Sequence, residues 1–301
     1  MQVTRMDLDG AGSPTALVAK ILKAEPDLAL PIPIEDLARQ LDIKEIRELD
    51  TEGFEGGLIT DAARSTGFIL VNRTARGGRR RFTIGHELGH FLMTHHKPPP
   101  GNGFRCRASD MRRWSKEDTG PQRWEVEANE FSALILMPPP MWRRELQRYH
   151  DPDLEQIVSL AKLFDVSKEA AARAYSQYHE KCVAIIVARD GRIDKIYRDV
   201  RRYPLMCVKV GDAVPPSSAL FRGPKELGQA SDLVEARAEL WLQSEWGKPM
   251  AELSEQVMLQ QNGYALILLW AEVQGEEEEY DPDAERAAKE RYRERQARWR
   301  S

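Results

Sequence analysis

Residues 80–92 read Arg-Arg-Phe-Thr-Ile-Gly-His-Glu-Leu-Gly-His-Phe-Leu, and this stretch decides the fold. Its apolar residues recur at helical spacing, which predicts an amphipathic helix with one face toward the core. The helix is expected to end by Lys97, because the prolines at 98–100 cannot continue it. His86 and His90 then lie on one face with Cβ atoms roughly 5–6 Å apart, so both can reach a single metal ion.

Glu87 gives this histidine pair its chemistry. It lies one step round the helix, beside the coordination position that remains open, where it can take a proton from water and hand it to a leaving amine. Zinc suits such a site because it lowers the pKa of bound water to about 7 and polarises a carbonyl group. The pattern also arises by chance, but the apolar helix and the strand-like residues before it favour a functional site.

A catalytic zinc needs a third protein ligand, and a nearby histidine is one candidate. His96 stands six residues beyond His90. This spacing is found in sites where the helix ends at a glycine and the following chain turns back, so that a third histidine reaches the metal. Met93 occupies that glycine position here. If the helix runs on through Thr94, His96 lies away from the ligand face, so His95 and His96 are expected at the surface or behind the ligands.

A carboxylate on a second helix is the stronger candidate for the third ligand. Glu125 lies in a predicted helix over residues 124–137, and packing of that helix beneath the first would bring its carboxylate to the metal. Asn129, one turn later, can hold the second ring nitrogen of a liganding histidine and so fix its tautomer. The rival carboxylates are Glu127, Glu130 and, in the preceding loop, Glu117.

The rest of the chain predicts an α+β protein with a mainly helical core and a small sheet in its first half. Further helices are expected at residues 15–24, 34–41, 139–148, 153–164 and 167–178. Strands are expected at 54–59 and 67–71, and a mobile loop at 101–121. After residue 180 the pattern changes to strands at 183–187, 193–197, 206–210 and 266–273, with a helix at 233–246.

These patterns divide the chain into four parts. Residues 1–150 carry the histidine motif, and residues 151–180 form a helix-turn-helix-like segment. Residues 181–275 form a small α+β domain of unknown role, and residues 276–301 a charged tail.

Composition points to an ordinary globular protein of the cytoplasm. The formal net charge of −4 over 301 residues gives no global reason to expect nucleic acid as the main partner, although it does not exclude it. We expect no membrane span, because no apolar run reaches about 18 residues, and no secretory signal. Cys106, Cys182 and Cys207 are widely spaced, which argues against a disulfide framework and against a thiolate zinc site.

The combination of motifs resembles the ImmA/IrrE family of bacterial metallopeptidases over roughly residues 30–180. The resemblance rests on Ile69-Leu-Val-Asn72, residues 80–90, Glu125-x-x-Ala-Asn129-x-Phe131, Leu136-Met-Pro138 and residues 160–170. It implies a zincin-like fold, Glu125 as the third zinc ligand, and cleavage of a regulatory protein, often a helix-turn-helix repressor. After Glu180 the chain does not match the sensor-like domain of the family's radiation-response branch, so the resemblance implies no signal sensing.

The helix-turn-helix-like segment favours a scaffold over a DNA reader. Its second helix, residues 167–178, is alanine-rich and almost neutral, whereas a recognition helix offers basic and polar side chains. The arginine-rich stretches 73–81 and 105–113 could bind phosphate or attract an acidic substrate toward the metal. Alternatively, they are solvent-exposed loops without a binding role.

The sequence thus predicts a zinc-dependent endopeptidase that hydrolyses a peptide bond in a specific regulatory protein by metal-activated water. His86, His90 and Glu125 bind the metal and Glu87 is the general base. Manganese is an alternative to zinc, since two histidines and a carboxylate suit several divalent metals. The alternative function is a DNA- or protein-binding transcriptional regulator with a structural or sensory metal site. The sequence assigns no group to oxyanion stabilisation, with residues 105–113 as the only guess.

Overall fold

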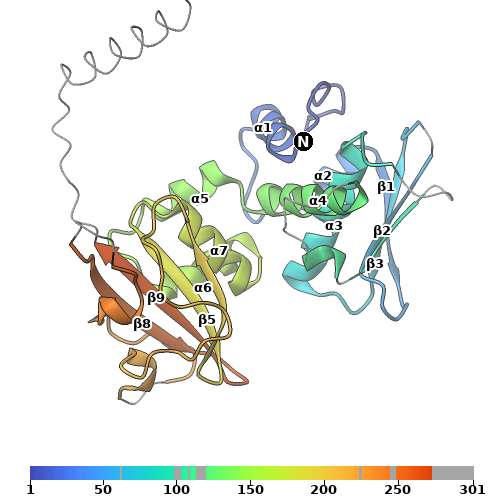
Figure 1. Cartoon of the computed structure of the whole chain (residues 1–301). Helices are drawn as coiled ribbons and strands as arrows, with labels where there is room; N and C mark the ends of the chain where they lie inside the picture. Colours follow the sequence, from blue (N-terminus) through green and yellow to red (C-terminus); the bar gives the residue numbers. More distant parts are fainter. Residues whose placement is uncertain are drawn as a thin grey trace, which may run out of the picture.

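A computed structural model of the chain describes residues 1–61, 63–97, 103–107, 109–112, 120–223, 226–244 and 249–272. These residues form two packing units side by side, joined through the connection between α4 and α5 (Figure 1). Each unit has its own sheet. The charged tail expected at residues 276–301 lies outside the described residues.

The first unit packs helices on one face of a four-stranded sheet in the order β1-β3-β2-β4. Strands β1 and β3 run parallel, and β2 runs antiparallel to both β3 and β4. The helices are α1 (Pro14–Ala24), α2 (Ile34–Gln40), α3 (Gly77–Leu92) and α4 (Pro121–Leu136). The strands are β1 (Ile43–Leu49), β2 (Gly56–Thr60), β3 (Gly67–Asn72) and β4 (Gly103–Cys106).

The alternation of side chains along β2 and β3 explains why this sheet is covered on one side. Leu58, Ile69 and Val71 are fully buried in the first core, whereas Ile59 and Phe68 are exposed on the outer face. Burial of every second residue is what a strand with one core-facing side requires. The two strands predicted at 54–59 and 67–71 are confirmed within about two residues.

Helices α3 and α4 approach each other closely because α3 has glycine at the contact. A Cβ atom placed on Gly85 would lie 2.6 Å from Ser132 Oγ, and one on Gly89 would lie 3.1 Å from the Phe131 ring. The Ser132 hydroxyl donates to the Phe82 carbonyl at 2.7 Å, which ties the two helices together. This contact sets the distance between the side chains that α3 and α4 offer each other.

The second unit is an antiparallel five-stranded sheet in the order β6-β5-β9-β8-β7. Its helices are α5 (Pro139–Leu146), α6 (Leu154–Phe164) and α7 (Lys168–Tyr178). Its strands are β5 (Val183–Arg189), β6 (Arg192–Arg198), β7 (Val234–Glu235), β8 (Glu252–Leu259) and β9 (Tyr264–Glu272). The three helices cover one face of the sheet, and residues between 203 and 242 cover the other.

Helix α7 packs as a scaffold element. Its buried side chains, Ala171, Ala172 and Tyr175, join the core between the helices and the sheet. Glu169 at its start accepts hydrogen bonds from Lys195 and Tyr197 of β6. A recognition helix must instead leave one face free for a DNA groove, so this packing supports the scaffold interpretation.

The structure corrects several sequence expectations of the fold. Helix α5, which we placed in the first domain, packs in the second core, and α6 and α7 share that core with the sheet. The helix expected at 233–246 is wrong: β7 and a 3-10 turn (Ala238–Leu240) lie there, because the Ala236 amide bonds to the Leu253 carbonyl of β8. The strand expected at 206–210 is reduced to one bridge between Met206 and Leu242. Strands β1, β4 and β8 were not predicted, and β4 lies within the expected mobile loop at 101–121.

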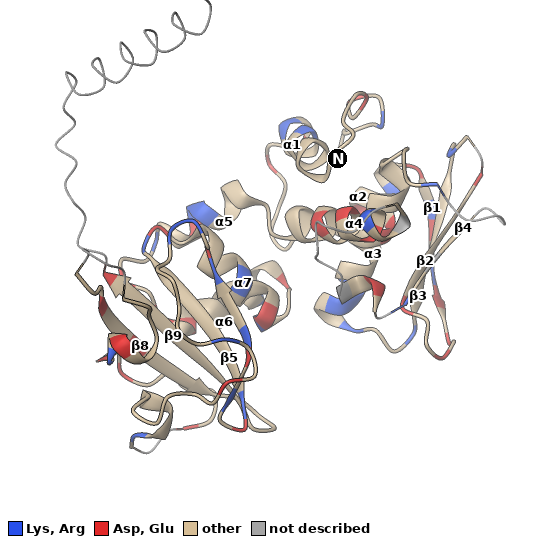
Figure 2. Cartoon of the chain, viewed as in Figure 1, with Lys and Arg blue, Asp and Glu red and all other residues tan. Residues whose placement is uncertain are grey.

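Charge is interspersed over both units in the view of Figure 2. The arginines at the start of α3 are already paired: Arg79 with Glu55, Arg80 with Glu35, and Arg81 with Asp165. These ion pairs weaken the phosphate-binding interpretation of residues 73–81. Among the described helices, none is long and apolar enough to cross a membrane.

The contact between Gly85 and Ser132 can be tested by a double-mutant cycle. Gly85→Ala should lower the free energy of unfolding, because overpacking costs about 1–3 kcal/mol and alanine's helix propensity returns only about 1 kcal/mol. Ser132→Gly should rescue part of this loss, so that the double variant is more stable than the two single changes predict. Urea unfolding measures the cycle, and strict additivity would contradict a direct contact.

His179 should make stability depend on pH. Burial lowers the pKa of its imidazole to about 4, and its Nδ1 accepts a hydrogen bond from the Lys181 amide at 3.0 Å. Because the folded pKa lies below the unfolded value, its contribution is present above pH of about 6.5 and is lost as pH falls toward 4. His179→Asn should flatten the fall in unfolding free energy over that range. The exposed His150→Asn is the control, and equal pH profiles for both variants would refute the assignment.

Candidate metal centre

Helix α3 places His86 and His90 against each other in the buried interior. Their Nε2 atoms lie 3.0 Å apart, and both side chains are fully buried. The i, i+4 spacing puts them on one face of the helix. The two ring nitrogens are therefore close enough together to bind one ion.

Helix α4 brings the Glu125 carboxylate to both histidines. Its Oε2 lies 3.2 Å from His86 Nε2 and its Oε1 lies 3.5 Å from His90 Nε2. Burial raises the pKa of Glu125, but its bonds to the two histidines outweigh burial and hold that pKa well below its usual range. Glu125 is therefore a carboxylate anion, the form in which it could bind a cation.

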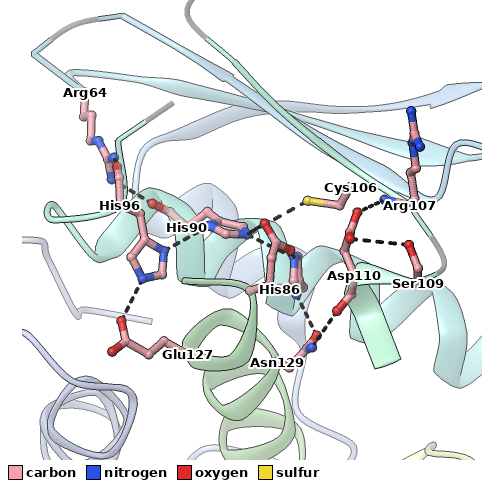
Figure 3. Close-up of polar contacts among 11 residues, drawn as sticks. Arg64, His86, His90, His96, Cys106, Arg107, Ser109, Asp110, Glu127 and Asn129 are labelled. Carbon is pink, nitrogen blue, oxygen red and sulfur yellow. Dashed lines mark hydrogen bonds and ion pairs between the residues drawn. The ribbon is translucent and has the colours of Figure 1, made fainter. Parts of the chain in front are cut away.

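Asn129 fixes the orientation of His86, as the sequence predicts for a residue behind the site. Its Nδ2 donates to the Asp110 carbonyl at 2.9 Å, so its Oδ1 faces His86 Nδ1 at 2.9 Å (Figure 3). An amide oxygen only accepts, so His86 Nδ1 must carry the proton. In the neutral ring Nε2 then carries the lone pair that faces His90 and Glu125, and Nε2 donates to Glu125 only when His86 is protonated.

His96 fixes the orientation of His90 through two successive hydrogen bonds. His90 Nδ1 lies 2.9 Å from His96 Nδ1, and His96 Nε2 lies 3.0 Å from Glu127 Oε2 (Figure 3). Since Glu127 accepts from His96 Nε2–H, His96 Nδ1 is free to accept from His90 Nδ1–H. The Glu127 carboxylate is also held by Arg123 at 3.0 Å and by His95 at 2.6 Å. The chain leaves His90 Nε2 available as a donor atom.

The helix ends earlier than the sequence suggests, and this is why His96 reaches the site. Helix α3 ends at Leu92, and the buried Arg64 guanidinium binds the carbonyls of His90 at 2.7 Å and Met93 at 2.9 Å. It also bonds to the His96 carbonyl. The helix does not run on through Thr94, but the two histidines lie where the sequence places them: His95 is exposed and His96 is buried behind His90.

Glu87 is a buried carboxyl group, and neither of its oxygens has a hydrogen-bond partner among the described residues. Burial raises the pKa of Glu87 to about 8, with His86 opposing and Glu125 adding to the rise. Gly56 of β2 makes the room for it, since a Cβ atom there would lie 2.7 Å from Glu87 Oε1. Such an unsatisfied group is costly to keep in a structure unless a ligand uses it.

Cys106 is the member of the site that sequence reasoning missed. Its Sγ lies 3.9 Å from His90 Nε2, at the end of β4 (Figure 3). The pairing of β4 with β2 sets Cys106 opposite Gly56 and so beside the histidines. This pairing leaves no local mark in the sequence, where Cys106 looks like an isolated cysteine in a loop.

The other residues considered as the third ligand or as the oxyanion group lie outside the cluster of donor atoms or outside the described residues. Glu127 lies behind His96, Glu130 lies outside the cluster, and Glu117 is outside the described residues. Of the arginines at 105–113, Arg107 has a described side chain, which is exposed and points away from the histidines in Figure 3. It therefore gives no support to the guess about the oxyanion.

The donor set fits a divalent metal ion. Two imidazole nitrogens with fixed tautomers and one carboxylate oxygen meet within 4.8 Å of one another. Nitrogen and oxygen donors of this kind suit zinc and also manganese. The Glu87 carboxyl beside them has no hydrogen-bond partner among the described residues, and a cation bound nearby would favour its charged form.

Comparison with known proteins finds similarity to a family of peptidases over the part of the chain that holds this site. Residues 38–176 match the family model described as the IrrE N-terminal-like domain of the M78 peptidases. The chain is also similar to the radiation response metalloprotease IrrE of Deinococcus radiodurans, with 31% identity over 124 residues. That alignment covers 41% of this chain and 35% of the relative, so the chain matches only about a third of that protein's length.

The residues behind the histidines should control metal affinity. We expect Asn129→Leu and His96→Leu each to weaken binding of zinc about 10–100-fold, because each removes the partner that fixes a ligand's tautomer. His150→Leu is the control, since His150 is exposed and lies outside the donor cluster. Competition with a chromophoric chelator measures the affinity. Equal affinities for the His150 and His96 variants would show that His96 does not support the site.

Proposed function

We propose that the chain is a zinc-dependent endopeptidase of the ImmA/IrrE type, a proposal supported by the match of residues 38–176 to the IrrE N-terminal-like domain model and by the similarity to a metalloprotease. One observation carries the proposal. A fully buried carboxyl group, Glu87, lies unpartnered beside three convergent donor groups. A purely structural metal site has no use for such a group, whereas hydrolysis of a peptide bond requires a base at that position.

The roles follow from the bonds that each residue makes. His86, His90 and Glu125 hold the metal, and Asn129 and His96 fix the two imidazole rings. A metal bound there supplies Lewis acidity that polarises the scissile carbonyl and acidifies the attacking water. Glu87 takes the proton from that water and delivers it to the leaving amine. Zinc is the metal we propose, with manganese as the alternative for the same donors.

The substrate we propose is a specific regulatory protein, most simply a helix-turn-helix repressor, cleaved in the cytoplasm. The resemblance carries this assignment, and the packing of α7 adds to it indirectly. Because α7 is built into the second core, the chain is less suited to read DNA itself than to act on a protein that does. Arg79, Arg80 and Arg81 are neutralised by ion pairs, which also argues against nucleic acid as the main partner.

A specific observation keeps the alternative in view. Cys106 is a fourth donor beside the three proposed ligands, and a site with four protein ligands is typical of structural zinc. A regulator with a structural or sensory metal site would have this closed arrangement. The two functions differ in whether they require the Glu87 carboxyl group.

Replacement of Glu87 separates them. Glu87→Gln should retain stoichiometric zinc but lose cleavage by about 10²–10⁴-fold, the contribution of a general base. The assay co-expresses the chain with a panel of helix-turn-helix proteins and identifies new termini by mass spectrometry. Glu130→Gln is the control on α4, outside the donor cluster. Cleavage by Glu87→Gln at the wild-type rate would exclude the proposed mechanism.

A further inference from the structure

The Cys106 side chain is buried in the first core, and its Sγ lies within the cluster of possible metal donors. We propose that its thiolate is a fourth, displaceable ligand of the metal, so that the site alternates between a closed form with four protein ligands and an open form with three. The inference rests on the proposed metal site and concerns its regulation. In the closed form no position is left for water or substrate, and the peptidase is latent.

The distances match a four-coordinate site. Zinc binds nitrogen or oxygen at about 2.0–2.1 Å and sulfur at about 2.3 Å, so tetrahedral ligand atoms lie roughly 3.3–3.6 Å apart. In the structure the two histidine Nε2 atoms lie 3.0 Å apart, Glu125 Oε2 lies 3.2 Å from His86 Nε2, and Cys106 Sγ lies 3.9 Å from His90 Nε2. All four ligand atoms lie within 4.8 Å of one another, so movements of about 1 Å or less would bring them onto one ion.

The Glu87 carboxyl group is a second observation that points to a ligand in this cluster. Glu87 is fully buried with both oxygens unpartnered, so the pocket that Cys106 enters already contains an unused acceptor. A thiol binds a metal as thiolate. Binding by Cys106 would therefore release its thiol proton to solvent, and a proton from solvent would return to sulfur when the thiolate is displaced.

The position of β4 makes the thiolate displaceable. The strand is at the edge of the sheet and pairs with β2 alone among the described strands. The histidines, in contrast, are held on α3, and Glu125 on α4, where the two helices pack closely through Gly85 and Gly89. A ligand on the edge strand can therefore leave while the other three stay in place. Polypeptide substrate is the ligand we expect to displace it.

The test uses a full-length variant in which Cys106 is the one remaining cysteine, Cys182→Ser/Cys207→Ser. Loaded with Co²⁺, it should show the strong near-ultraviolet absorption of cobalt–thiolate charge transfer. The band should be lost when Cys106→Ala is added. Stoichiometric Co²⁺ without the band in the variant that keeps Cys106 would overturn the proposal, and this result does not depend on how the Cys106→Ala variant folds.

The second test compares the zinc affinity and the cleavage activity of the Cys106→Ala variant with those of the wild type. Chelator competition should show zinc binding weakened at least tenfold in Cys106→Ala, while cleavage of the substrate increases because the fourth position is always open. A thiolate band in the chain that keeps Cys106, together with no cleavage by a zinc-loaded Cys106→Ala variant, would support the fourth ligand but sink the proposed peptidase. Active cleavage with Co²⁺ bound and no band would sink the fourth ligand and leave the peptidase standing.

Discussion

Helix α3 can lie against α4 only because Gly85 and Gly89 carry no side chain at the contact. This close approach is what lets a carboxylate of ordinary length on α4 span the gap to two imidazoles on α3. Both Glu125 and Asn129 use it, on the same face of α4 and one turn apart. A separation larger by one methyl group would leave Glu125 short of His90, so the composition of the helix interface decides whether a three-donor site exists.

The close packing also creates an electrostatic problem that the surrounding residues partly solve. His86, His90 and Glu87 are fully buried, and an isolated charge in such a place is strongly unfavourable. Asn129 satisfies one histidine, and His96 with Glu127 satisfies the other. Glu87 has no such support among the described residues. The cluster therefore carries more acceptor capacity than protein donors can fill, which is the condition in which a cation binds well.

What could be predicted from the sequence follows the range of the interactions involved. His86, Glu87 and His90 depend on one turn of one helix, and Glu125 and Asn129 on one turn of the next, so i, i+4 spacing placed them together. His96 depends on Arg64 binding the carbonyls at the end of α3, and Cys106 on the pairing of β4 with β2. Both are long-range contacts without periodicity. The wrong helix at 233–246 has the same cause, since pairing with β8 overrode local helical spacing.

The presence of Glu87 and Cys106 in one pocket constrains what the site can be. A structural metal centre would use the thiolate and leave Glu87 as a buried carboxyl group without function, at a cost in stability. A permanently open peptidase would use Glu87 and keep a buried thiol beside its metal ligands, where it competes with water for the metal. The presence of Glu87 thus argues against a permanently closed structural site, and the presence of Cys106 argues against a permanently open catalytic site. A site with two coordination states uses both, because Cys106 would close the fourth position and Glu87 would act as the base when that position is open.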